Sequence, residues 1–233
     1  MRLAVLDALL AARQARQPAA LITDLADGRQ VLLCADKIEG GSPLDAEAGA
    51  AVQECLMRDR SAMIETNART LFVHVFNPPP RLIVVGAVHI ALALARMAAM
   101  VGYDVTIIDP RRGFAEREAF ADFTVHTGWP DAALAELRSD ARTAIVTLTH
   151  DPKLDDPALR AALRSGAFYV GALGSTKTHE ARCRRLRADG CGEEELRRIH
   201  GPVGLRIGAV SPEEIAISIL AEVTAVRRKG ATA

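Results

Sequence analysis

Arg81-Leu82-Ile83-Val84-Val85 runs directly into Gly86-Ala87-Val88-His89-Ile90-Ala91, and this stretch decides the fold class of the 233-residue chain. The first segment is apolar after Arg81, as in a strand that is buried on both faces of a sheet. The second places a glycine at a tight turn and leads into a helix expected over residues 89–100. A strand, a glycine turn and a helix in this order are typical of the first unit of a dinucleotide-binding fold.

Strand and helix patterns continue to alternate towards the end of the chain. The expected strands are 104–109, 122–126, 143–149 and 167–171, and the expected helices are 131–138, 155–165, 176–189 and 212–228. Such alternation favours a parallel sheet with helices on both faces. We therefore predict an α/β fold, a Rossmann-like doubly wound parallel sheet preceded by a small α+β domain.

The boundary between these two parts is expected at Asn77-Pro78-Pro79-Pro80, because proline lacks an amide donor and fixes φ. Residues 1–76 are predicted to form the small α+β domain and residues 77–233 the Rossmann-like domain. In the first domain we expect a hairpin around Asp27-Gly28, a helix that begins at Ser42-Pro43, and a second hairpin around Asn67-Ala68-Arg69. The expected elements are helices 3–15 and 42–57 and strands 19–25, 30–34, 62–66 and 70–76.

Composition excludes several classes of protein. Lys+Arg and Asp+Glu both number 29, so no basic excess indicates a nucleic-acid partner. Four cysteines without a CxxC pair favour a reducing compartment, and the chain start does not resemble a signal peptide. The longest apolar run, residues 90–101, contains Arg96 and is far shorter than the roughly 20 residues of a membrane span. These features predict a soluble cytoplasmic protein.

The first turn departs from the GxGxxG pattern of dinucleotide sites, because Val88 stands where the second glycine is expected. Asp109 ends the next strand, where an acid that binds an adenosine ribose is expected. Two interpretations stay open at this point. This edge holds a nucleotide or nucleotide-like cofactor, or the fold is a scaffold whose phosphate site has decayed.

Two further clusters follow later strands, at the sheet edge where open α/β proteins bind ligands. His150 and Asp151 either contact a ligand or form a helix-capping turn. Gly174, Ser175 and Lys177 open a helix and suit an anion, although the spacing is not that of a Walker A loop. The arginines that follow are interpreted as solvated residues on a capped helix: Arg182, Arg184, Arg185 and Arg187. No histidine motif predicts a metal site, no GxSxG elbow supports a serine hydrolase, and no catalytic residue is predicted.

Several stretches together resemble one protein family. They are residues 79–86, 105–111, 149–155 and 169–175, then Gly201-Pro202-Val203-Gly204-Leu205 and Pro212-Glu213-Glu214-Ile215-Ala216. In these segments the chain resembles the XdhC/CoxI family of xanthine dehydrogenase accessory factors, over roughly residues 77–229.

The resemblance implies a non-catalytic chaperone that binds the molybdenum cofactor, as molybdopterin or its cytosine dinucleotide. It implies help with sulfuration by a cysteine desulfurase and with insertion into a molybdenum hydroxylase apoenzyme; we expect a homodimer. On this interpretation Gly86 and His89 line the first turn and Asp109 closes one side. His150 and Asp151 cover the ligand. Its phosphate is held by Gly174, Ser175 and Lys177.

Two departures from the family pattern leave alternatives open. The usual first turn reads Gly-Ala-Gly-His, and the amino-terminal glycine-rich and Gly-Gly-Cys segments are reduced here to Gly40-Gly41-Ser42-Pro43, with Cys34 upstream. One alternative is an NAD(P)-dependent oxidoreductase, supported by the fold and Asp109. The other is a ligand-free assembly protein, which the valine at position 88 permits.

Overall fold

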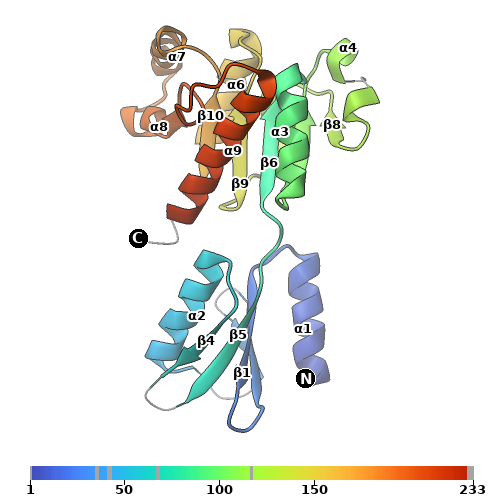
Figure 1. The fold of residues 1–233 in the computed structure, drawn as a ribbon, viewed down its shortest axis with the longest axis vertical. Helices are drawn as coiled ribbons and strands as arrows, with labels where there is room; N and C mark the ends of the chain where they lie inside the picture. The colour runs from blue at the N-terminus through green and yellow to red at the C-terminus, as the bar shows by residue number, and fades with distance from the viewer. Residues whose placement is uncertain (1, 35–36, 41–43, 67–68, 116–117, 230–233) are drawn as a thin grey trace. The chain divides into compact units, whose positions relative to one another are not determined.

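The computed structural model describes residues 2–34, 37–40, 44–66, 69–115 and 118–229. These residues form two compact units (Figure 1). One unit comprises the described residues up to Pro78 together with Arg228 and Lys229, and the other comprises Pro79–Arg227. The division into two domains, residues 1–76 and 77–233, stays a prediction.

The first unit contains an antiparallel sheet with the strand order β3-β2-β1-β5-β4. Both predicted hairpins are present, since β1 pairs with β2 and β4 pairs with β5. The strands are β1 (Ala19–Asp24), β2 (Gln30–Cys34), β3 (Lys37–Glu39), β4 (Ala62–Glu65) and β5 (Thr70–Phe76). The short strand β3, which pairs with β2, was not predicted, because three residues are too few to show a strand period.

One helix packs on each face of this sheet. Alternate residues of β1 point to opposite faces, so Ala20 and Ile22 pack with helix α2 (Ala46–Arg58) while Ala19 and Leu21 pack with α1 (Leu3–Gln14). The predicted start of α2 at Ser42-Pro43 lies outside the described residues, as does Asn67-Ala68 of the second hairpin loop. The described helix begins later than predicted, at Ala46, because the Asp45 side chain accepts a 2.8 Å hydrogen bond from the Ala48 amide and caps it.

The second unit confirms the predicted Rossmann-like parallel sheet. Its strand order is β11-β10-β9-β6-β7-β8, and every neighbouring pair is parallel. This order reverses between β6 and β9, as in dinucleotide-binding folds. The strands are β6 (Arg81–Val85), β7 (Asp104–Ile108), β8 (Thr124–His126), β9 (Thr143–Thr147), β10 (Tyr169–Ala172) and β11 (Ile199–His200).

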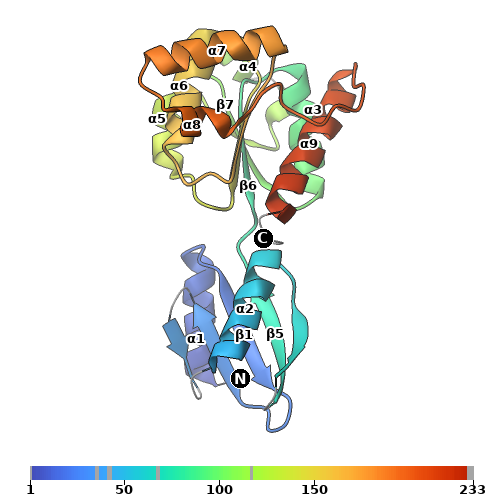
Figure 2. The ribbon, with the colours of Figure 1, turned by 90° about the vertical axis from the view of Figure 1, so that its left-hand side faces the viewer.

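Helices cover both faces of this sheet, as Figure 2 shows. Leu82 and Val84 of β6 pack towards α3 and α9, whereas Ile83 and Val85 pack towards α5 and α6. The helices are α3 (His89–Met100), α4 (Arg112–Ala115), α5 (Pro130–Leu137), α6 (Pro152–Leu163), α7 (Thr176–Ala188), α8 (Glu193–Arg197) and α9 (Pro212–Lys229), with a 3₁₀ turn at Glu118–Phe120. None of the helices in the described part of the chain is long and apolar enough to cross a membrane.

Two differences from the predicted elements bear on the site. Helix α6 begins at Pro152 instead of residue 155, because the Asp151 side chain accepts a 2.9 Å hydrogen bond from the Lys153 amide and proline is well suited to a first helical position. Strand β11 and helices α4 and α8 were not predicted, since each is too short to show a period. Strand β11 makes a sixth strand where five were expected.

Candidate functional site

The carboxyl ends of the parallel strands gather all the residues predicted to bind a ligand. In open α/β sheets the ligand crevice lies at this edge, where the strand order reverses, here between β6 and β9. The predicted residues sit in four loops: Gly86 and His89 after β6, Asp109 after β7, His150 and Asp151 after β9, and Gly174, Ser175 and Lys177 after β10.

The turn after β6 touches the loop after β9. Gly86 has φ +109°, and a Cβ atom placed on it would lie 2.6 Å from Cγ2 of Thr149. Both the backbone conformation and the close approach therefore require glycine at this position. The two loops on either side of the strand-order reversal are therefore in direct contact.

Helix α3 begins directly after this turn. Val88 is its N-cap residue with φ −98°, a conformation open to any residue, and its side chain makes no capping hydrogen bond. The missing second glycine is thus tolerated by the backbone, and the partly buried valine side chain packs against the core beneath α3. His89 is exposed in the first turn of α3.

Asp109 is fully buried, and both oxygens of its carboxylate already accept hydrogen bonds from neighbouring groups of the chain. Oδ2 accepts hydrogen bonds from the Ala87 amide (2.8 Å) and Arg111 Nη2 (2.8 Å), and Oδ1 accepts from the Arg111 amide and Nε, both at 2.9 Å. Burial raises the pKa of Asp109, but these hydrogen bonds outweigh it and hold the pKa below its usual value. The carboxylate shapes the turn after β6, and a ligand ribose would have to displace one of these donors to bind it.

The loop after β9 presents His150 to solvent in a left-handed conformation, with φ 60°. Asp151 faces the backbone, because its side chain caps α6. Thr149 donates a 2.6 Å hydrogen bond from its hydroxyl to Oδ1 of Asp155 in the first turn of that helix. In this loop the imidazole of His150 is the side chain best placed to contact a ligand.

The loop after β10 leads into α7 through Gly174, which has φ +144°. Ser175 is the N-cap, and its hydroxyl oxygen accepts a 3.1 Å hydrogen bond from the Thr178 amide. Lys177 is exposed in the first turn. A helix N-terminus with a lysine beside it carries positive charge and unsatisfied amides, which suits an anionic group.

One prediction about α7 is wrong. Arg182 is not solvated: it is 1% exposed, and its Nη2 lies 3.6 Å from Oδ2 of Asp155. Arg185 is partly exposed, and its Nε donates a 2.5 Å hydrogen bond to Oδ2 of Asp156. Leu186 is the sequence signal that was overlooked, because it lies one helical turn after Arg182 and places that arginine on the buried face.

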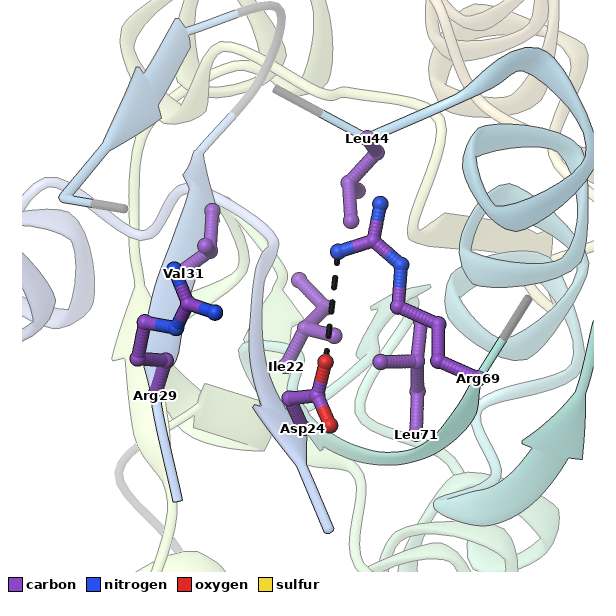
Figure 3. A pocket seen from close by; sticks show the side chains of 7 residues that line it. All are labelled: Ile22, Asp24, Arg29, Val31, Leu44, Arg69 and Leu71. Carbon is purple, nitrogen blue, oxygen red and sulfur yellow. Dashed lines mark ion pairs between the residues drawn. The ribbon is translucent and has the colours of Figure 1, made fainter. Parts of the chain in front are cut away.

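The first unit contains a separate hollow of about 160 Å³ (Figure 3). Its lining consists of Ile22, Asp24, Arg29, Val31, Leu44, Arg69 and Leu71. Arg69 lies 4.0 Å from Asp24 and 3.7 Å from Asp45, and Arg29 pairs with Asp27. Both arginines therefore already have carboxylate partners. An anionic ligand would find fewer unpaired positive charges in this hollow than at the sheet edge, where Lys177 is exposed.

Across the described ranges, no group of three or more His, Cys, Asp or Glu residues is placed to hold a metal ion.

Residues 82–223 match the family described as the XdhC Rossmann domain. The chain belongs to the XdhC family. It is 36% identical over 152 residues to the molybdenum cofactor insertion chaperone PaoD of Escherichia coli, covering 65% of this chain and 42% of PaoD. It is 33% identical over 161 residues to a probable xanthine dehydrogenase subunit of Bacillus subtilis, covering 68% and 46% of the two chains.

A solved structure named as a xanthine dehydrogenase from Bacillus halodurans has the same fold, with a TM-score of 0.72 at 24% identity, covering 96% of this chain and 64% of that one. The family match over residues 82–223 confirms the predicted resemblance to XdhC. The XdhC-family match contains the whole sheet edge described above. This XdhC-family chain spans less than half the length of the two curated relatives.

Proposed function

We propose that this chain is a maturation factor for molybdenum hydroxylases, which binds the molybdenum cofactor at the carboxyl edge of its parallel sheet and assists insertion of the cofactor. The observation that carries the proposal is the gathering of two glycine turns and two helix N-termini, those of α3 and α7, along the carboxyl edge of the parallel sheet. The chaperone name of PaoD, a relative through this same domain, supports it.

The residues present fit a phosphate-bearing pterin. The cofactor carries a phosphate, or a pyrophosphate in its cytosine dinucleotide form, and the first turn of α7 offers unsatisfied amides and Lys177 to such a group. A Cβ atom on Gly86 or Gly174 would clash with Thr149 or Thr178 respectively. Gly86 is buried, so glycine there lets the loops after β6 and β9 pack closely, whereas the partly exposed Gly174 leaves main chain accessible beside the N-terminus of α7.

The predicted residues divide into two roles on this proposal. Lys177 and His150, both exposed at the edge, contact the ligand directly, with His89 beside the first turn. Three other side chains accept hydrogen bonds from backbone amides and so fix the conformation of the loops: those of Asp109, Asp151 and Ser175. The division follows from the hydrogen bonds that each side chain already makes.

Cofactor content tests the proposal. The full chain is co-expressed with an intact molybdenum-cofactor pathway, and bound pterin is released, oxidised and measured by fluorescence. We expect stoichiometric pterin in the wild type and its loss in Lys177→Ala and His150→Ala. Lys37→Ala, which removes an exposed lysine from the first unit, serves as the control and should keep its pterin. Absence of pterin together with micromolar NAD(P) binding would replace the proposal with an oxidoreductase, and binding of neither ligand would leave an assembly protein.

The finer parts of the proposal concern partners and compartment. We propose that the chain receives the cofactor in the cytoplasm as a homodimer, supports its sulfuration by a cysteine desulfurase, and delivers it to a molybdenum hydroxylase apoenzyme. Light scattering measures the oligomeric state. Pull-down with the purified desulfurase and the apoenzyme measures the two partnerships, and capture of neither would confine the role to cofactor binding.

A further inference from the structure

Two charged residues lie buried directly beneath the sheet edge. Asp155 in the first turn of α6 and Arg182 in the middle of α7 are each 1% exposed, with 3.6 Å between Oδ2 and Nη2. Burial raises the pKa of Asp155 and lowers that of Arg182, so each group is shifted towards its neutral form. The interior thus disfavours both charges.

Each member of the pair also holds one of the candidate ligand loops. Arg182 donates from Nη2 to the carbonyl of Leu173 at 2.8 Å, and Leu173 directly precedes the Gly174 turn. Asp155 accepts from the Thr149 hydroxyl at 2.6 Å, and Thr149 directly precedes His150. The two loops are therefore joined through one buried ion pair.

The pair is poorly suited to stabilising the fold. Oδ2 of Asp155 and both Nε and Nη1 of Arg182 have no hydrogen-bond partner within the part of the chain that the structure describes. A buried ion pair with unsatisfied atoms contributes little net stability, and apolar residues of similar volume often replace such pairs without loss. The pair therefore acts mainly on the two loops that it connects, rather than on the stability of the fold.

We propose that Asp155 and Arg182 are positioning residues of the ligand site, which fix the loop after β9 relative to the loop after β10. The inference rests on the proposed function, because it assigns the pair a role in presenting His150 and Lys177 to the cofactor. Neither charged group touches the ligand. A shift of either loop would separate the imidazole from the helix N-terminus that receives the phosphate.

The neighbouring ion pair provides a matched control. Asp156 and Arg185 join the same two helices with hydrogen bonds of 2.5 and 3.0 Å, and none of their hydrogen bonds that the structure shows involves Thr149 or Leu173. Loss of this pair weakens the contact between α6 and α7 without releasing the loops. A comparison of the two pairs therefore separates loop positioning from helix packing.

The experiment compares two double variants of the full chain, Asp155→Leu/Arg182→Met and Asp156→Leu/Arg185→Met. Cofactor released from a purified molybdenum enzyme is the probe, and affinity is measured beside the melting temperature. We expect the first variant to have a melting temperature near that of the wild type. Its affinity for the cofactor should be lower on the order of tenfold, which is the smallest loss usually seen when a residue that supports a metal ligand is replaced. The second variant should bind like the wild type. Equal affinities in both variants would overturn the inference.

Hydrogen exchange provides a readout that needs no ligand. Amides of residues 149–151 and 173–175 should exchange faster in the first double variant than in the second, and unchanged exchange would contradict the inference even if the wild type binds no cofactor.

If the first double variant does not fold, Arg182→Lys replaces it, because lysine keeps the charge but lacks the planar guanidinium group of arginine. That variant should show the same faster exchange and weaker binding at an unchanged melting temperature, and wild-type values would overturn the inference. If the wild type binds no cofactor but the exchange rates differ as expected, the proposed function is refuted and the inference about the two loops stands.

Discussion

A Cβ atom on Gly86 would lie 2.6 Å from Cγ2 of Thr149, so the turn after β6 leaves no room for a side chain against the loop after β9. The contact exists because β6 and β9 are neighbours in the sheet although they are far apart in sequence. Their carboxyl ends therefore meet, and the two loops form the centre of the candidate site. Its geometry depends on this glycine more than on any side chain of the turn.

Gly86→Ala should consequently be more damaging than alanine at another glycine with positive φ. Gly102 has φ +88° and no atom within 4 Å of a built Cβ, so Gly102→Ala pays only for the backbone conformation, about 1–2 kcal/mol. Gly86→Ala adds the clash with Thr149, and we expect a clearly larger loss in the free energy of unfolding from urea titrations. Equal losses in the two variants would show that the loop after β9 moves away from the new methyl group at little cost in free energy.

Asp109 should make stability depend on acidic pH. Hydrogen bonds from Arg111 and from the Ala87 and Arg111 amides hold its folded-state pKa below the unfolded-state value of about 3.9. The stabilisation is therefore fully present above about pH 4 and is lost as the pH falls through the folded-state pKa.

Asp109→Asn tests this dependence. At neutral pH we expect a loss of about 1.5–3 kcal/mol in the free energy of unfolding, because hydrogen bonds to a charged group are removed. The difference from the wild type should shrink as the pH is lowered to about 3. Asp122→Asn, at an exposed position before β8, is the control for removing a carboxylate. A difference that stays constant over the whole range would contradict the prediction.

The sheet and its ligand edge were predictable because they follow from local patterns. Buried parallel strands are short apolar runs, and parallel strands necessarily place their carboxyl ends at one edge. A glycine after β6 and another after β10 were therefore enough to locate the candidate site. The XdhC resemblance rested on these segments together with Gly201-Pro202-Val203-Gly204-Leu205 and Pro212-Glu213-Glu214-Ile215-Ala216.

The roles of individual charged residues were not predictable in this way. Asp109 has the sequence position of a ribose-binding acid, but Arg111, two residues on, occupies its carboxylate. Arg182 stands in a run of basic residues, but packing of α7 against α6 buries it beside Asp155. The spacing of Leu186 indicates that Arg182 lies on the buried face of α7, but its pairing with Asp155 depends on a tertiary contact that neither propensity nor spacing encodes.

Tyr169 should stabilise the second unit through a single hydrogen bond. Its hydroxyl donates to Oε2 of Glu222 on α9 at 2.5 Å, and the same oxygen accepts from the Gly204 amide at 2.8 Å. Burial raises the pKa of Tyr169 well above its usual range, and the neighbouring Glu222 raises it further, so the hydroxyl remains a donor at alkaline pH. Tyr169→Phe should cost about 1–3 kcal/mol in the free energy of unfolding.

The control for this prediction lies on the same helix. Thr224 donates its hydroxyl to the Leu220 carbonyl at an exposed position, so Thr224→Ala should change the free energy of unfolding by less than about 0.5 kcal/mol. Chemical denaturation at neutral pH measures both variants. Glu222 also has His200 Nδ1 at 3.2 Å from its Oε1. A Tyr169→Phe variant as stable as Thr224→Ala would show that Gly204 and His200 are sufficient partners for Glu222.

Val88→Gly distinguishes a cofactor chaperone from a nicotinamide enzyme. Val88 is the N-cap of α3, where glycine is preferred to valine, and this gain opposes the loss of the valine packing against the core, so the melting temperature should change little. The substitution restores the glycine pattern of dinucleotide sites and opens space over the turn. We nevertheless expect calorimetry to show little gain in affinity for NAD⁺ or NADPH, because Arg111 and Ala87 still occupy the carboxylate that would bind the ribose. Val88→Ala, which keeps a Cβ atom, is the matched control. A large gain in nucleotide affinity that is confined to Val88→Gly would favour the oxidoreductase, since removal of one side chain would then have restored a dinucleotide site.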